Sequence, residues 1–126
     1  MKVCISSKGN SIQSIMDPRF GRAAYFIIAD TETMEIELIE NSAAASGGGA
    51  GITSGQLMVD KDVTAVITGN VGPNAMNVLK AANIEIYRGE PILVKENIEK
   101  FKKGKLEKIN ATVPSHFGMG VQGEQK

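Results

Sequence analysis

Two arginines and two glycine-rich segments are the parts of this sequence best suited to chemistry. Arg19 and Arg22 are three positions apart, and guanidinium groups bind carboxylates or phosphates through paired N–H donors. The glycine-rich segments, residues 47–51 and 69–75, each precede a predicted helix. Helix N-termini present unpaired N–H groups at the positive end of the helix dipole. Together these features predict a site for an anion.

A purely structural interpretation of the same residues is also open. Gly69, Gly72 and Pro73 can serve only to form a tight turn, while both arginines pair with surface carboxylates. The glycine run also departs from the nucleotide-binding fingerprints. Ser54 stands where the dinucleotide motif needs glycine or alanine, and no Gly-Lys-Ser/Thr sequence is present for a P-loop.

Residues for catalysis are sparse. The lone histidine, His116, stands near the chain end and predicts no nucleophile–base pair. Asp17, Asp30, Asp60 and Asp62 are candidates for metal-dependent phosphoryl transfer, which requires carboxylates clustered around metal ions. Asp30 precedes a hairpin turn and the last two end a helix, so we interpret the aspartates as surface and turn residues. We therefore predict neither an enzyme nor a metal site made of protein ligands.

The elements that must position the anion site follow from the hydrophobic pattern. Residues 63–69 are apolar without polar alternation, which indicates a strand covered on both faces. Strands and helices then alternate, which requires a parallel sheet covered on both faces, and a predicted hairpin over 23–41 adds an antiparallel strand. The prediction is therefore a three-layer α/β domain with a mixed sheet. In such sheets, ligands bind beyond the carboxyl ends of the parallel strands. Strands are predicted at 2–6, 23–30, 35–41, 63–69 and 84–89, and helices from Ile52, Pro73 and Val94.

The composition excludes several classes of protein. The chain has 126 residues, and we predict a single α/β domain over residues 1–110 and a flexible tail over 111–126. Fourteen basic and fourteen acidic residues cancel, so neither nucleic acid nor a membrane surface is an expected partner. No apolar run is long enough to span a membrane. The single cysteine, Cys4, lies in an apolar strand and is predicted to be a buried thiol; we expect a cytoplasmic location.

Three segments in a fixed order resemble a known family. They are "DPRFGRAAYFIIAD" (17–30), "GGGAGI" (47–52) and "VTAVITGNVGPNAMNVLKAANIEIYRG" (63–89). Their combination resembles the dinitrogenase iron–molybdenum cofactor biosynthesis family, over Lys2 to about Gly120. The resemblance implies a ribonuclease-H-like motif. Its mixed five-stranded sheet would have the order 3-2-1-4-5, with the second strand antiparallel and helices on both faces.

The resemblance also implies a ligand, an anionic iron–sulfur or iron–molybdenum cluster or its precursor. Another cofactor-assembly protein is then a candidate partner. Many relatives carry histidines before the "GAG" motif or in the tail, but here residues 43–46 lack histidine and the tail offers only His116. The predicted cofactor-binding residues are Arg19, Phe20, Gly21, Arg22, Gly49, Gly51, Gly69, Asn70, Gly72 and Asn74.

The preferred hypothesis is a non-enzymatic binding or carrier protein for such an anionic cofactor. The first alternative is a small regulatory or interaction domain that binds a nucleotide or metabolite in the same pocket. The second is a metal-dependent phosphotransferase or nuclease, against which the scattered carboxylates argue.

Overall fold

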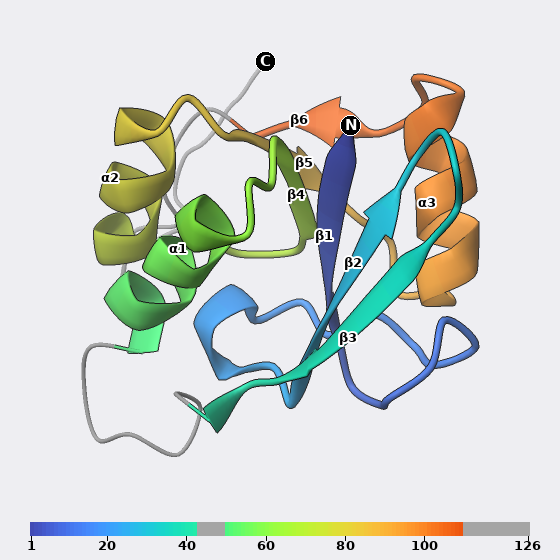
Figure 1. The fold of residues 1–126 in the computed structure, drawn as a ribbon, viewed down its shortest axis with the longest axis horizontal. Coiled ribbons are helices and arrows are strands. Elements are labelled where there is room, and N and C mark those ends of the chain that lie inside the picture. Colours follow the sequence, from blue (N-terminus) through green and yellow to red (C-terminus); the bar gives the residue numbers. More distant parts are fainter. Residues whose placement is uncertain (43–49, 110–126) are drawn as a thin grey trace, which may run out of the picture.

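The computed structural model describes residues 1–42 and 50–109. The strands are β1 (Lys2–Ser7), β2 (Tyr25–Asp30), β3 (Ile36–Glu40), β4 (Ala65–Thr68), β5 (Glu85–Arg88) and β6 (Glu107–Lys108). The helices are α1 (Ala50–Asp60), α2 (Pro73–Ala81), α3 (Val94–Lys102) and the short 3-10 helix η1 (Phe20–Arg22) (Figure 1). In these two ranges, the helices are too short or too polar to cross a membrane. The predicted tail, 111–126, lies outside the described residues, so the boundary at residue 110 stays a prediction.

All the strands belong to one mixed sheet with the order β3-β2-β1-β4-β5-β6. Strand β2 is antiparallel to both β1 and β3, whereas β1, β4 and β5 are parallel to one another. The predicted order 3-2-1-4-5 with an antiparallel second strand is therefore confirmed. The additional strand β6 pairs antiparallel with β5 and contains only two residues. Such a short strand has no periodicity that a sequence could reveal.

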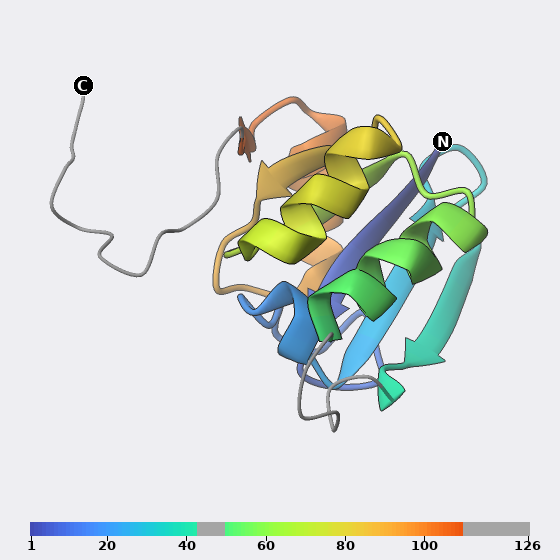
Figure 2. The same ribbon diagram turned by 90° about the vertical axis from the view of Figure 1, so that its left-hand side faces the viewer.

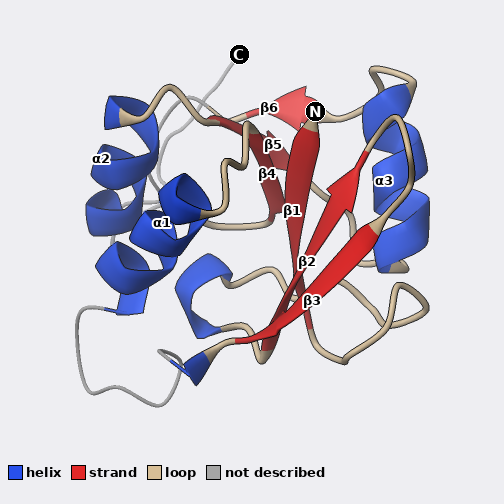
Figure 3. Ribbon diagram, viewed as in Figure 1, coloured by secondary structure: helices blue, strands red, loops and turns tan. Residues whose placement is uncertain are grey.

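Helices cover both faces of the sheet and complete the predicted three layers. Helices α1 and α2 lie on one face and α3 on the other, as the ribbon coloured by secondary structure makes plain (Figure 3). Alternate residues of β1 point to opposite faces. Val3 and Ile5 pack in the core under α3, whereas Cys4 packs in the core under α1 and α2. Cys4 is fully buried as predicted, and this burial raises the pKa of its thiol.

The helix ends follow the predicted signals. Pro73 occupies the first position of α2, where its missing N–H leaves no hydrogen bond unmade. Gly104 follows the end of α3 with φ +70°, a left-handed conformation that glycine adopts without strain. Helix α1 begins two residues earlier than predicted and ends one residue earlier.

A glycine in α1 allows α1 and α2 to pack closely. The two helices lie side by side in both ribbon views (Figures 1 and 2). A Cβ atom at Gly55 would lie 2.9 Å from Val78 Cγ1 and 3.0 Å from its Cβ. No other residue fits at position 55 unless α2 shifts or its side chains change.

We predict that Gly55→Ala destabilises the protein by roughly 1–3 kcal/mol. The clash with Val78 should outweigh the gain of about 1 kcal/mol in helix propensity. Adding Val78→Ala should relieve the clash, so that the double variant is more stable than the sum of the two single effects implies. Urea unfolding of the four proteins in a double-mutant cycle measures this coupling. Additive effects would show that this contact does not set the distance between the helices.

Candidate functional site

A cleft of about 350 Å³ lies at the edge of the sheet where β1, β4 and β5 end, at the bottom of Figure 1. Three chain segments line it: residues 19–22, the start of α1, and the loop from β4 into α2. We call it the edge cleft. Its lining residues are Arg19, Phe20, Gly21, Arg22, Gly51, Asn70, Gly72, Pro73, Asn74 and Ala75.

Most of the predicted cofactor-binding residues come together in this cleft. Eight of the ten line it, although they come from segments far apart in the sequence. Gly69 does not line the cleft but lies behind it, against Pro18. Gly49 falls outside the described residues. That any of these residues binds a cofactor remains a prediction.

Backbone hydrogen bonds join the arginine segment to the loop between β4 and α2. The N–H groups of Gly69 and Asn70 both donate to the carbonyl oxygen of Pro18, at 3.1 and 2.6 Å. The N–H of Phe20 donates in return to the carbonyl of Asn70, at 3.3 Å. Two walls of the edge cleft are therefore held in register by the main chain.

Buried hydroxyl groups fix the same segment to the strand ends beneath it. The Ser6 hydroxyl, at the end of β1, donates to the carbonyl oxygen of Asp17 at 2.6 Å. It also lies 2.7 Å from the Thr68 hydroxyl at the end of β4. Both hydroxyl-bearing residues are fully buried. Because a buried polar group without a partner costs about 1–3 kcal/mol, this network resists displacement of the loop.

Asp17 orients Arg19 at the rim of the edge cleft. The Asp17 carboxylate accepts hydrogen bonds from the Arg19 backbone N–H at 2.9 Å, from Nε at 3.1 Å and from Nη2 at 2.9 Å. The Asp17 side chain is 2% exposed and that of Arg19 63% exposed. Burial by itself raises the pKa of Asp17, but the hydrogen bonds and charge of Arg19 outweigh it and hold that pKa below its usual value.

The interpretation of Asp17 as a surface residue is therefore wrong. Its carboxylate accepts a hydrogen bond from the N–H of Arg19, two residues later, in a local turn that aspartate favours. The order Asp-Pro-Arg is compatible with this turn, but the burial of Asp17 comes from the strand ends beneath it. The alternative in which the arginines pair with surface carboxylates holds for Arg19 only in part. Arg19 pairs with a carboxylate, but that carboxylate, on Asp17, is buried.

We predict that Asp17→Asn lowers the stability of the protein at neutral pH but not in strong acid. Because the folded-state pKa of Asp17 is depressed, its stabilisation is present above the unfolded value of about 3.9 and is lost as the pH falls through the folded value. The difference in unfolding free energy between wild type and variant should shrink as the pH falls below about 5. Urea unfolding from neutral to acid pH measures it. Asp62→Asn, at an exposed position, is the matched control; a pH-independent difference would contradict the assignment.

The glycines around the edge cleft have different physical roles. A Cβ at Gly51 would lie 3.3 Å from Ala75 Cβ, so two small residues bring the starts of α1 and α2 together. A Cβ at Gly69 would lie 2.6 Å from Pro18 Cβ and 2.9 Å from the Pro18 backbone. At Gly72, by contrast, a Cβ would have no atom within 4 Å, and φ is −73°. Neither packing nor backbone conformation requires glycine at position 72.

We predict opposite outcomes for two alanine substitutions in the same loop. Gly69→Ala should cost roughly 1–3 kcal/mol because its Cβ meets the Pro18 backbone. Gly72→Ala should cost no more than about 1 kcal/mol, because its Cβ meets no atom and only the poorer N-capping of alanine counts against it. Thermal and urea unfolding of both variants test the pair. Equal destabilisation would mean that Gly72 is structural after all.

Two residues that support the edge cleft were not predicted. The Asn41 Nδ2 group donates to the carbonyls of Gly21 and Ala23, at 3.2 and 2.8 Å, and so holds η1 in place. Arg88, at the end of β5, donates from Nη1 to the carbonyl of Gly69 at 3.0 Å. Asparagine at the last position of a predicted strand is a weak signal, and nothing in the sequence distinguished Arg88.

The charged side chains that line the edge cleft, Arg19 and Arg22, are hydrogen-bond donors, as are N–H groups at the helix starts. The side-chain amides of Asn70 and Asn74 add both donors and acceptors. Within residues 1–42 and 50–109, no three histidine, cysteine, aspartate or glutamate side chains gather as a metal site would require. The histidine His116 lies outside these ranges.

Solved structures share this α/β fold. The apo form of the orange protein of Desulfovibrio gigas is 31% identical, with a TM-score of 0.82 over 86% of this chain and 92% of that one. The Thermotoga protein TM1290 is 40% identical, with a TM-score of 0.81 over 90% of this chain and 97% of that one. An uncharacterized protein of Methanocaldococcus jannaschii, MJ0580, is 37% identical over 112 residues, which cover 86% of this chain and 92% of the relative.

The sequence model of the dinitrogenase iron–molybdenum cofactor family matches residues 1–104. The chain therefore belongs to this family, as the order of its three motifs indicated. The family and its structural relatives identify a small cofactor-related protein.

Proposed function

We propose that this chain is a non-enzymatic binding or carrier protein for an anionic iron–sulfur or iron–molybdenum type cofactor, or a precursor of one. The edge cleft is the site, and Gly72 is the observation that carries the proposal. This residue caps the start of α2 without a side-chain hydrogen bond and without a structural need for glycine. Its missing side chain leaves the positive end of α2 open to a ligand in the cleft.

The charge balance of the edge cleft favours an anion. Arg22 lines the cleft, and the starts of α1 and α2 add the positive ends of two helix dipoles. The charge of Arg19 is balanced by Asp17, but that pair engages only two of the five guanidinium N–H groups. The other three are left to donate to a ligand.

We propose that the cargo is held through its outer atoms. Amide N–H and guanidinium groups do not ligate metal ions, but they donate hydrogen bonds to anionic acceptors such as sulfide or oxo groups. A cluster bound in this way keeps all its own metal ligands and can be released without breaking a metal–protein bond. The volume of about 350 Å³ falls within the usual range for small-ligand pockets. Release of this kind suits transfer to another cofactor-assembly protein.

We predict that Gly72→Asp abolishes cargo binding while Gly72→Asn preserves it. Both side chains are good N-caps for α2, so both variants should fold as stably as wild type. Only aspartate adds a negative charge at the cleft, which should weaken the binding of an anion more than tenfold. Anaerobic titration with an iron–sulfur cluster donor, followed by visible absorption, compares the three proteins. Arg22→Ala should also weaken uptake.

Two results would overturn the proposal. The first is the absence of any absorption change when wild-type protein is titrated with the cluster donor. The second is equal loading of the aspartate and asparagine variants, provided that thermal unfolding shows both to be folded. Equal loading would place the bound cluster away from the start of α2.

A further inference from the structure

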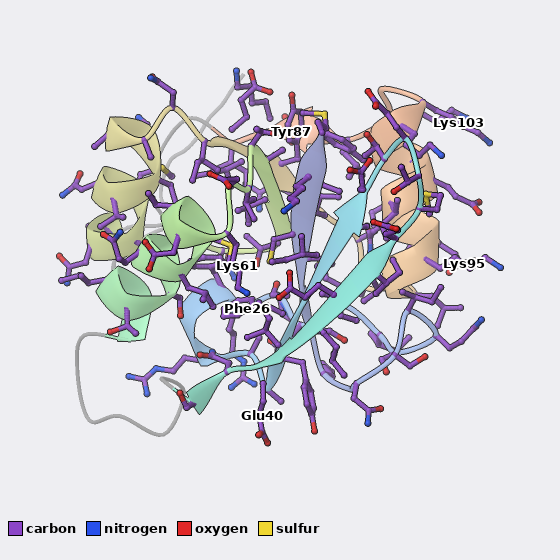
Figure 4. All side chains as sticks on the ribbon, viewed as in Figure 1. Phe26, Glu40, Lys61, Tyr87, Lys95 and Lys103 are labelled. Atoms are coloured by element: carbon purple, nitrogen blue, oxygen red, sulfur yellow. The ribbon has the colours of Figure 1, made fainter. Side chains whose placement is uncertain are left out.

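A second and larger cavity, of about 460 Å³, lies toward the opposite end of the sheet. We call it the aromatic groove. It is bounded by the turn after β2, by β5 and by the end of α3. In Figure 4, Tyr87 and Lys103 mark this end, while Glu40, the last residue of β3, marks the other. Its lining residues include Thr31, Tyr87, Phe101, Lys102, Gly104 and Leu106.

The floor of the aromatic groove is apolar. The rings of Tyr87 and Phe101 meet edge to face, with centroids 5.1 Å apart and an interplanar angle of 77°. Leu106 packs beside them at the margin of the core under α3, and all three side chains are half-buried. The Tyr87 hydroxyl donates to Glu85 at 2.7 Å, so its polar end is already satisfied. The floor therefore offers carbon surface to a ligand.

One lysine, Lys102, lines the aromatic groove, and Lys103 and Lys105 adjoin its lining residues in the sequence. Among the ion pairs found in the described ranges, Lys100 pairs with Glu90 at 3.7 Å and Lys108 with Glu85 at 3.2 Å. The exposed residues Lys102, Lys103 and Lys105 have no carboxylate partner among those pairs.

Lysines at a helix end also offset the negative end of its dipole. That role explains the charges, but it does not explain an apolar cavity beside them. The Nζ atom of Lys102 lies 3.7 Å from Met34 Sδ, a weak contact that a carboxylate or sulfonate would displace. Apolar floor and unpaired cations together define the chemistry of a matching ligand.

We propose that the aromatic groove binds a small amphipathic organic anion. Its aromatic or aliphatic body lies on Tyr87, Phe101 and Leu106, and its acid group pairs with Lys102. A small molecule is favoured over a protein surface because separate chain segments enclose a concave space, whose volume falls within the range of small-ligand sites. The groove and the edge cleft lie at different ends of the sheet, so both can be occupied at once.

Two dyes with the same rings test the proposal on the full chain. Anilinonaphthalene sulfonate carries an acid group, and phenylnaphthylamine lacks it. We expect the sulfonate to bind more tightly, with fluorescence enhancement and with amide NMR shifts confined to Thr31 and residues 101–106. Lys102→Glu should weaken sulfonate binding roughly tenfold and leave the neutral dye unaffected. Lys95→Glu makes the same charge change at the other end of α3 and should alter neither.

Three outcomes would overturn the proposal. One is binding of both dyes with equal affinity, which would indicate apolar adsorption alone. Another is NMR shifts centred on residues away from the groove. The third is an equal loss of sulfonate binding in the Lys102 and Lys95 variants, which would indicate a general effect of net charge. Any of these outcomes would leave the proposal for the edge cleft unaffected, because that proposal is tested with different residues and a different ligand.

Discussion

The buried carboxylate of Asp17 is the constraint on which the candidate site depends. It accepts three hydrogen bonds from Arg19, and the backbone carbonyl of Asp17 accepts one from the Ser6 hydroxyl. The carbonyl oxygen of the next residue, Pro18, accepts hydrogen bonds from the N–H groups of Gly69 and Asn70, at the start of the loop that leads to α2. The short segment from Asp17 to Arg19 therefore ties β1, β4 and the helix start to one another. An ionised group is retained in this buried position because every hydrogen bond that it accepts also positions a wall of the cleft.

In the proposed anion site, the edge cleft would recognise charge more through the direction of its donor groups than through its net charge. A site with several unpaired cations would attract any polyanion over a long range. Here Asp17 cancels the charge of Arg19, and much of the remaining attraction comes from dipoles and N–H groups fixed by the fold. Such groups stabilise an anion only when its acceptor atoms match their geometry. This arrangement would suit the proposed carrier, which must distinguish one inorganic anion from phosphates and carboxylates.

The sequence patterns were sufficient for most of the fold and for the place of the site. Buried strands and helix-start signals predicted a mixed sheet and the convergence of the loops at one edge, while the sheet order came from the family resemblance. Other features depend on tertiary contacts that no local pattern contains. The burial of Asp17 needed the strand ends beneath it, and β6 is too short for a period. Ile36 and Leu38 are apolar but 42% and 45% exposed, because they lie on β3 at the edge of the sheet.

The placement of Cys4 has a consequence for the proposed binding of a metal–sulfur cargo. Cys4 carries the only thiol in the sequence, and it has no exposed surface. It lies on β1, a strand that pairs with β2 on one side and with β4 on the other. Its raised pKa keeps it protonated, so it is a poor nucleophile and a poor metal ligand. The chain thus cannot exchange its thiol with the sulfur of a cargo while it is folded. Reaction of Cys4 with a thiol reagent requires the centre of the sheet to open. The rate of this reaction therefore reports on global unfolding.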